Sequence, residues 1–179
     1  MAKKIASKNS TVIGVDPGAT TGIFLFEEGK PKKGISFKTF WETIAFFEEN
    51  KSATFVVENA NLNKPTFGYE YAINLIKESG YSYANIKKQL LTFSKKGQNV
   101  GMVKMRTTLY LEFFECMGIK HHAIRPIKGM KNVASKKSFY HIIDTNNIKS
   151  ERNQHVQDAF WTALLYIQHK NKFETQNQK

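Results

Sequence analysis

The stretch TVIGVDPGATTGIFLFE, residues 11–27, constrains the fold more than any other part of the sequence. Two short apolar runs flank a Pro-Gly pair, a pattern that predicts two strands joined by a tight turn. The first strand, over residues 11–16, ends in Asp16. Because open sheets collect their ligands at the carboxyl ends of strands, Asp16 is the first candidate functional residue.

Strand and helix patterns alternate along the rest of the chain. A third strand is expected over 32–38, after the turn at Glu28-Gly29-Lys30-Pro31, so the first three strands should form an antiparallel meander. Thr39 can cap the next helix, with Glu42 at the capping-box position. The other expected elements are a helix over 39–50, a strand over 52–60, helices over 85–93 and 97–118, a strand over 119–127, a helix over 135–144, and a terminal helix over 151–170 followed by a frayed end over 171–179.

Length and composition favour one globular domain of 179 residues, 41% of them hydrophobic. Lys and Arg outnumber Asp and Glu by 27 to 15, and residues 59–150 hold 15 of the basic and 5 of the acidic residues. This excess favours a polyanionic partner, most obviously nucleic acid. With Cys116 as the one cysteine, neither a disulfide framework nor a thiolate metal site can form within one chain. Since no signal segment or run of about 20 apolar residues occurs, we expect a soluble cytoplasmic protein with no membrane partner.

Three acidic residues and a histidine form the candidate chemical site. Glu58 ends the strand expected over 52–60, while His155 and Asp158 lie one turn apart on the terminal helix, beside the small Ala159. If that helix packs across the strand ends, these side chains and Asp16 converge. Clustered carboxylates repel one another and need a divalent cation, and oxygen ligands favour Mg²⁺ or Mn²⁺ over Zn²⁺. Two ions about 4 Å apart could activate water and stabilise the leaving oxygen of a phosphodiester.

Each of these residues also has an ordinary structural alternative. Asp16 precedes a Pro-Gly pair and is compatible with simple turn chemistry. Glu58 could cap a loop, and His155 could be a solvated helix residue. The functional interpretation therefore depends on the combination and the order of the four residues.

Taken together, several segments resemble the RuvC-like Holliday junction resolvases, a branch of the RNase H-like nuclease superfamily. The matching segments cover most of the chain and are VIGVDPGATTG, VVEN, KGQNVGMVKM, AIRP, SKKSFYHII and HVQDA. The resemblance implies an α/β fold of the RNase H-like type, with helices flanking a mixed five-stranded sheet of three antiparallel strands and then two parallel ones. It also implies a homodimer that makes paired cuts in branched DNA, especially four-way junctions, with two Mg²⁺ ions that Mn²⁺ could replace.

The resemblance also implies roles for individual residues. Asp16, Glu58 and Asp158 match the family's metal-binding carboxylates, and His155 matches a fourth ligand position that holds Asp or His. Lys136 or Lys137 aligns with a basic residue that the family places near the scissile phosphate. We take Lys137 as the candidate catalytic lysine and Lys136 as a candidate DNA contact.

The segment over residues 61–96 is longer than the resemblance predicts, and we interpret it as an insertion or an extended junction-contacting region. Phe67 and Tyr69, beside Lys64, are candidates for an aromatic contact near the crossover, with core packing as the alternative. Basic residues of the middle of the chain should bind phosphates without reading sequence, unless they form only a solvated surface. They are Lys64, Lys87, Lys88, Lys95, Lys96, Lys104 and Arg106.

Three other functions remain open from the sequence. A ribonuclease H would share the fold and the metals and cut the RNA of an RNA/DNA hybrid. GVDPGATTG also resembles the first phosphate loop of actin-like and sugar-kinase-like ATPases, although 179 residues leave no room for their second domain, so only a fragment would fit. A non-catalytic DNA-binding module would account for the basic charge alone.

Overall fold

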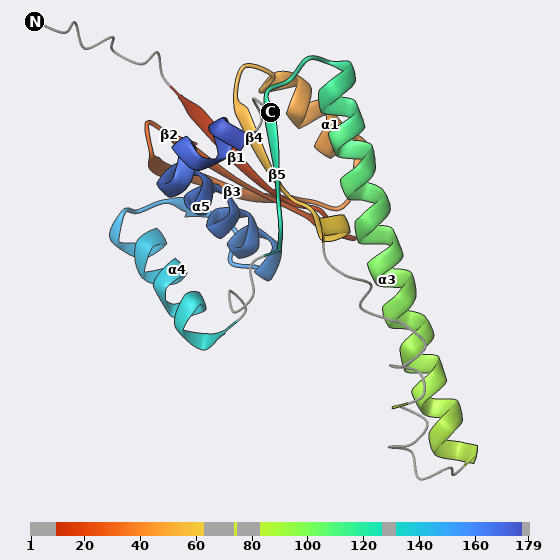
Figure 1. The fold of residues 1–179 in the computed structure, drawn as a ribbon. Helices are drawn as coiled ribbons and strands as arrows, with labels where there is room; N and C mark the ends of the chain where they lie inside the picture. The colour runs from red at the N-terminus through yellow and green to blue at the C-terminus, as the bar shows by residue number, and fades with distance from the viewer. Residues whose placement is uncertain (1–9, 63–73, 75–82, 127–131, 177–179) are drawn as a thin grey trace, which may run out of the picture.

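The computed structural model describes residues 10–62, 74, 83–126 and 132–176 (Figure 1). These residues form an α/β fold in which helices flank one mixed six-stranded sheet with the order β5-β4-β1-β2-β3-β6. The strands are β1 (Thr11–Asp16), β2 (Thr21–Glu27), β3 (Lys30–Phe37), β4 (Thr54–Glu58), β5 (His121–Ile124) and β6 (Lys149–Ser150). The helices are α1 (Phe40–Glu49), the short 3₁₀ helix η1 (Ala60–Leu62), α3 (Tyr83–Cys116), α4 (Val133–Thr145) and α5 (Gln154–Gln176).

The first five strands pair as the sequence predicts. β1, β2 and β3 form an antiparallel meander, and β4 and β5 continue the sheet in parallel with β1. The two residues between β2 and β3, Glu28 and Gly29, both have positive φ, 52° and 76°. This is the conformation of a two-residue type I′ hairpin turn, whose twist matches that of the flanking strands. The turn expected over 28–31 is therefore confirmed at its first two residues, whereas Lys30 and Pro31 already belong to β3.

The predicted count of five strands is wrong, because β6 adds a sixth at the edge beside β3. Lys149 and Ser150 pair in parallel with Lys33 and Gly34, and the next amide, that of Glu151, donates to the Gly34 carbonyl at 3.0 Å. Two residues are too few to show the period-2 alternation that identifies a strand in a sequence. The terminal helix begins at Gln154, three residues later than the predicted start at residue 151. The preceding residues 149–151 hydrogen-bond to β3 at the edge of the sheet.

Each face of the sheet is covered by two helices and has its own core (Figure 1). On one face, Phe24 and Phe26 of β2 pack against Phe139 of α4 and Phe160 of α5. The other core joins α1 and α3 to the sheet through Ile13, Ile23, Phe47, Tyr110 and Phe114. Because β1 is buried on both faces, its sequence is a nearly continuous apolar run.

α3 differs from the prediction in its length. The two helices expected over 85–93 and 97–118 are one helix of 34 residues. Residues 94–96, which separated the two expected helices, continue the helix, and Gly97 after them costs only about 1 kcal/mol relative to alanine. The second part of the segment expected as an insertion thus belongs to α3, while residues 63–73 and 75–82 lie outside the described residues.

α5 also extends further than predicted. The frayed end expected from residue 171 onward is helical as far as Gln176, past a non-helical conformation at His169 (φ −121°, ψ 20°). Within the described ranges, no helix combines the length and the apolar composition that crossing a membrane requires.

The predicted cap of α1 is confirmed. The Thr39 hydroxyl accepts a hydrogen bond from the Glu42 amide at 3.2 Å, and the Thr39 amide donates to the Glu42 carboxylate at 3.2 Å. A further hydrogen bond of 2.7 Å joins the Thr39 hydroxyl to that carboxylate. The side-chain hydrogen bond from Thr39 lowers the pKa of Glu42 from its usual value of 4.5, with the backbone hydrogen bond acting in the same direction.

We predict that Thr39→Ala lowers the melting temperature by about 2–4 °C at pH 7, because it removes the cap. Since the folded-state pKa of Glu42 lies below 4.5, its stabilisation is present above that pH and is lost as the pH falls through the folded-state value. The difference in melting temperature between the two proteins should therefore shrink below pH 4.5. Thermal unfolding followed by circular dichroism at pH 7 and pH 3.5 measures both effects. Equal differences at the two pH values would contradict the prediction.

Candidate active site

Asp16 and Glu58 end two neighbouring parallel strands, β1 and β4. They therefore lie at the same edge of the sheet, the one formed by the carboxyl ends of these strands. The register pairs Val15 of β1 with Val57 of β4, and each acid follows directly in its strand. Val56 belongs to the core beneath α5, and side chains two residues apart on a strand share a face. Glu58, which is half-buried, therefore lies on the face of the sheet that α5 covers.

α5 lies directly against the backbone of β1 and β2. A Cβ atom at Gly14 would lie 2.0 Å from the carbonyl oxygen of Ala159, and one at Gly22 would lie 2.0 Å from the carbonyl oxygen of His155. Both contacts are with backbone atoms, so a side chain at either position would force the helix away from the sheet. The predicted close approach of the helix at Ala159 is confirmed.

His155 is brought into direct contact with Asp16 by this packing. Its ring Nδ1 lies 2.8 Å from Oδ2 of Asp16, and the two residues are 139 positions apart in the chain. Because an ionised carboxylate has no hydrogen to donate, Nδ1 carries the proton and donates it. The Asp16 side chain is 13% exposed and that of His155 is 41% exposed, so the pair opens to solvent on the histidine side.

Asp158 lies one turn further along α5 and is 4% exposed. Its Oδ1 accepts a hydrogen bond of 2.7 Å from Nε2 of Gln154, one turn before it on the helix. The sequence analysis did not single out Gln154, although its i, i+4 spacing to Asp158 was the available signal. Gln154 supplies the neutral donor that a nearly buried carboxylate requires.

The start of α5 is held against β3 by a group of polar contacts. Asn153 caps the helix, with its side-chain oxygen accepting from the Val156 amide at 2.9 Å. The amide nitrogen of the same side chain donates to the Ser36 hydroxyl at 3.1 Å and to the Glu151 carboxylate at 3.0 Å. The Ser36 amide also donates to Glu151, at 3.1 Å. These contacts determine where the first turn of α5, with His155, meets the sheet.

The four predicted ligands are thus brought to one edge of the sheet, but they are paired with neighbours rather than gathered around a common centre. In the part of the chain that the structure describes, no three His, Cys, Asp or Glu side chains form a group that could hold a metal ion. The donor set nevertheless fits Mg²⁺ or Mn²⁺, which prefer carboxylate oxygens and accept an imidazole nitrogen. Each of these bonds involves one oxygen of the carboxylate, Oδ2 of Asp16 and Oδ1 of Asp158, so both acids could bind an ion while keeping these hydrogen bonds.

The candidate basic residues lie on two helices. Lys136 and Lys137 are exposed in the first turns of α4, where the Lys136 ammonium lies 5.7 Å from the centre of the Tyr140 ring. On α3, Lys87, Lys88 and Lys95 are exposed and Lys104 is half-buried. Lys96 also belongs to α3, whereas the predicted contacts Lys64, Phe67 and Tyr69 lie outside the described residues.

Arg106 of α3 has a contact that the sequence analysis did not foresee. Its Nη1 donates to the carbonyl oxygen of Gly18 at 2.6 Å and to that of Ala19 at 3.0 Å. Both carbonyls belong to the turn that follows Asp16. Arg106 was predicted as a phosphate contact, and in the structure its Nη1 is bound to the protein's own backbone.

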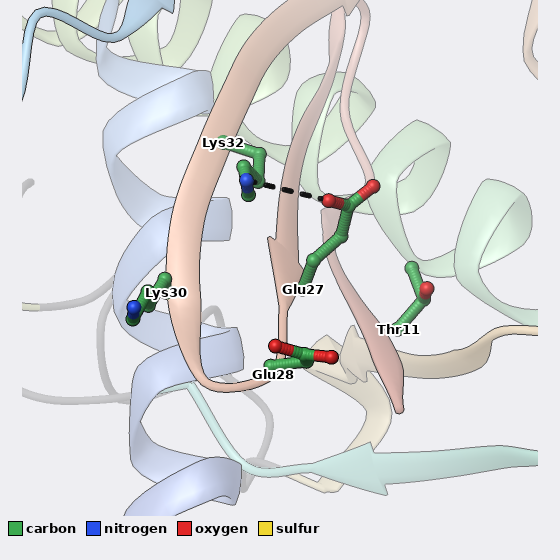
Figure 2. A pocket seen from close by; sticks show the side chains of 5 residues that line it. All are labelled: Thr11, Glu27, Glu28, Lys30 and Lys32. Carbon is green, nitrogen blue, oxygen red and sulfur yellow. Dashed lines mark ion pairs between the residues drawn. The ribbon is translucent and has the colours of Figure 1, made fainter. Parts of the chain in front are cut away.

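A hollow of about 280 Å³ opens at the other end of β1, as Figure 2 shows. It is lined by Thr11, Glu27, Glu28, Lys30 and Lys32, and an ion pair of 3.5 Å joins Lys32 to Glu27. The length of the strand separates this hollow from Asp16 by about 17 Å. It therefore contributes nothing to the candidate active site.

The chain matches no model of a known protein family and no curated protein sequence. The geometry of the site and the pattern of the sequence must therefore support any functional conclusion.

We predict that Gly22→Ala destabilises the protein by at least about 1–3 kcal/mol, because the new methyl group meets the backbone of α5. Gly101→Ala is the matched control, since an added Cβ at this exposed position of α3 has no neighbour within 4 Å. It should be neutral or stabilising by up to about 1 kcal/mol. Urea unfolding of the two variants and the original protein measures both values. Equal stability of Gly22→Ala and the original protein would show that α5 does not rest on the β2 backbone.

Proposed function

We propose that this protein is a divalent-metal-dependent endonuclease that cuts branched DNA, with four-way junctions as its main substrate. The single observation that carries the proposal is the placement of four side chains. Asp16 and Glu58 end adjacent parallel strands, and α5 brings His155 and Asp158 over the same edge. Asp16, Glu58 and Asp158 are distant in the sequence but lie on the same face of the sheet, near the carboxyl ends of β1 and β4. Carboxylates grouped in this way are the donors that a metal-dependent phosphodiesterase needs.

The arrangement of the sheet supports an RNase H-like fold as the finer description. Three antiparallel strands are followed by two parallel ones, with β1 at the junction between the two kinds of pairing. Asp16 ends that strand. We propose that β6, a two-residue edge strand, is an addition to this fold rather than a departure from it.

In the proposed reaction, the metal ions would supply the hydrolytic chemistry, and the side chains of the protein would hold the ions and the phosphate. Two Mg²⁺ ions, when bound, would activate a water molecule and stabilise the leaving oxygen of the phosphodiester. Asp16, Glu58 and Asp158 would hold them through oxygen, and His155 through its ring nitrogen. Before binding, the proton on Nδ1 of His155 partly balances the negative charge of Asp16 and keeps its side chain in one orientation. Lys137, on α4, would bind the phosphate that is cut.

The charge of the chain supports a nucleic-acid substrate. The 15 basic residues between 59 and 150 face only 5 acidic ones, and the described lysines among the candidates lie on α3 and α4. They would bind the phosphates of the junction arms without reading base sequence. A homodimer would place two active sites for paired cuts. Met105 and Leu109, which are 60% and 39% exposed on the face of α3 opposite its buried residues, offer an apolar surface for that association.

We predict that the protein cuts a four-way junction in the presence of Mg²⁺ and not in the presence of chelator. Asp16→Asn should lower the cleavage rate by at least about 100-fold, because it removes a negative charge from the metal ligands, while junction binding is retained. Glu49→Gln, which changes an exposed carboxylate on α1, is the matched control and should cut normally. Linear duplex and an RNA/DNA hybrid are assayed beside the junction. Cleavage of the hybrid alone would identify a ribonuclease H, and full activity of Asp16→Asn would refute the metal site.

We also predict that junction affinity falls steeply with salt. If five to seven phosphates are neutralised, the logarithm of the binding constant should fall with the logarithm of salt concentration with a slope of about −4 to −6. Replacing both Lys136 and Lys137 with glutamine should reduce that slope by about 2. Replacing both Lys30 and Lys51, exposed lysines outside the basic segment, is the control that removes the same charge and should leave the slope unchanged. A flat dependence on salt in the original protein would contradict a phosphate-binding surface.

A further inference from the structure

The turn between β1 and β2, residues 17–20, lies between two helices on opposite faces of the sheet. α3 reaches it from the face that holds Tyr110 and Phe114, and the first turn of α5 reaches it from the other. Pro17 and Gly18 are buried in this position, although turns usually lie at the surface. The turn begins directly after Asp16, so its conformation bears directly on the direction of that side chain.

On the α3 side, the turn is held at two points one helical turn apart. Nη1 of Arg106 donates to the carbonyl oxygens of Gly18 and Ala19 at 2.6 and 3.0 Å. Four residues later, the Tyr110 hydroxyl forms a buried hydrogen bond of 2.8 Å with the hydroxyl of Thr21. The first point is charge-assisted and therefore the stronger of the two.

On the α5 side, the same turn lies against the catalytic histidine. An ideal Cβ at Gly18 would lie 3.4 Å from Cε1 and 3.6 Å from Nδ1 of the His155 ring. That same Nδ1 lies 2.8 Å from Asp16. The His155 ring therefore bounds the space beside Gly18, the residue whose carbonyl Arg106 holds, and Gly18 lies two residues after Asp16 in the chain.

From these contacts we infer that Arg106 is a positioning residue: it fixes the turn after Asp16, and through Gly18 it sets the geometry of the Asp16–His155 pair. Its positive charge serves the protein's own carbonyls rather than a phosphate of the substrate. The catalytic consequence rests on the proposed nuclease function, whereas the structural consequence does not. Lysine is a poor substitute, because it carries a single ammonium in place of the planar guanidinium fork.

The experiment compares Arg106→Gln and Arg106→Lys with the original protein and with Lys51→Gln, which removes one exposed positive charge far from the turn. Amide hydrogen exchange is measured first, on the protein free of metal and DNA. Junction affinity, the salt dependence of binding, and the cleavage rate at saturating junction follow. Circular dichroism and melting curves identify any variant that fails to fold, and Arg106→Lys, which keeps the long stem and the charge, provides a second variant if Arg106→Gln does not fold.

In Arg106→Gln, we expect exchange of the amides of residues 18–21 to accelerate by about tenfold, with Arg106→Lys between this variant and the original. The rate at saturating junction should fall by about 10- to 100-fold, while affinity and salt slope match those of Lys51→Gln. A salt slope reduced by about 0.9 with unchanged exchange would identify Arg106 as a phosphate ligand and overturn the inference. Unchanged exchange in both variants would also overturn it. If the original protein cuts no substrate, the proposed function fails, and the exchange rates still decide the role of Arg106.

Discussion

The backbone contact between α5 and the sheet is the constraint on which the rest of the structure depends. Gly14 and Gly22 leave no room for a side chain between the strands and the carbonyls of Ala159 and His155. Because the helix touches backbone rather than flexible side chains, its height and its angle above the sheet have little freedom. The position of His155 relative to Asp16 follows from that contact, and the hydrogen bonds from Asn153 to Ser36 and Glu151 hold the start of the helix against β3.

The same constraint explains why the candidate site lies at this edge of the sheet. Parallel pairing of β1 with β4 brings Asp16 and Glu58 to matching ends, and α5 carries His155 to the end of β1. Asp158 is almost fully buried and is stabilised by Gln154, which serves as a neutral partner. The protein therefore orients Asp16 and Asp158 through one carboxylate oxygen each, and the proposed ions could bind beside these hydrogen bonds.

Much of the fold could be predicted because the deciding signals are local. The two runs around Asp16, the hairpin at Glu28-Gly29 and the cap at Thr39 are each carried by a few adjacent residues. β6 could not be predicted, since two residues have no period, and the continuity of α3 was hidden by the polar residues 94–96, which carry no apolar period. For the site, residue types and order predicted which side chains share the sheet edge. They could not predict that Arg106 binds carbonyls, because a guanidinium can donate to backbone carbonyls as well as to phosphates.

The contact between positions 16 and 155 closes a span of 139 residues. During synthesis on the ribosome, the strand that ends in Asp16 emerges long before the helix that supplies His155. A nascent or prematurely terminated chain can form the β1–β2–β3 meander, but it lacks half of the proposed ligands and the helix that covers the glycine-lined face. If the protein cuts DNA, hydrolytic competence arises only once α5 has been synthesised and has packed against the sheet.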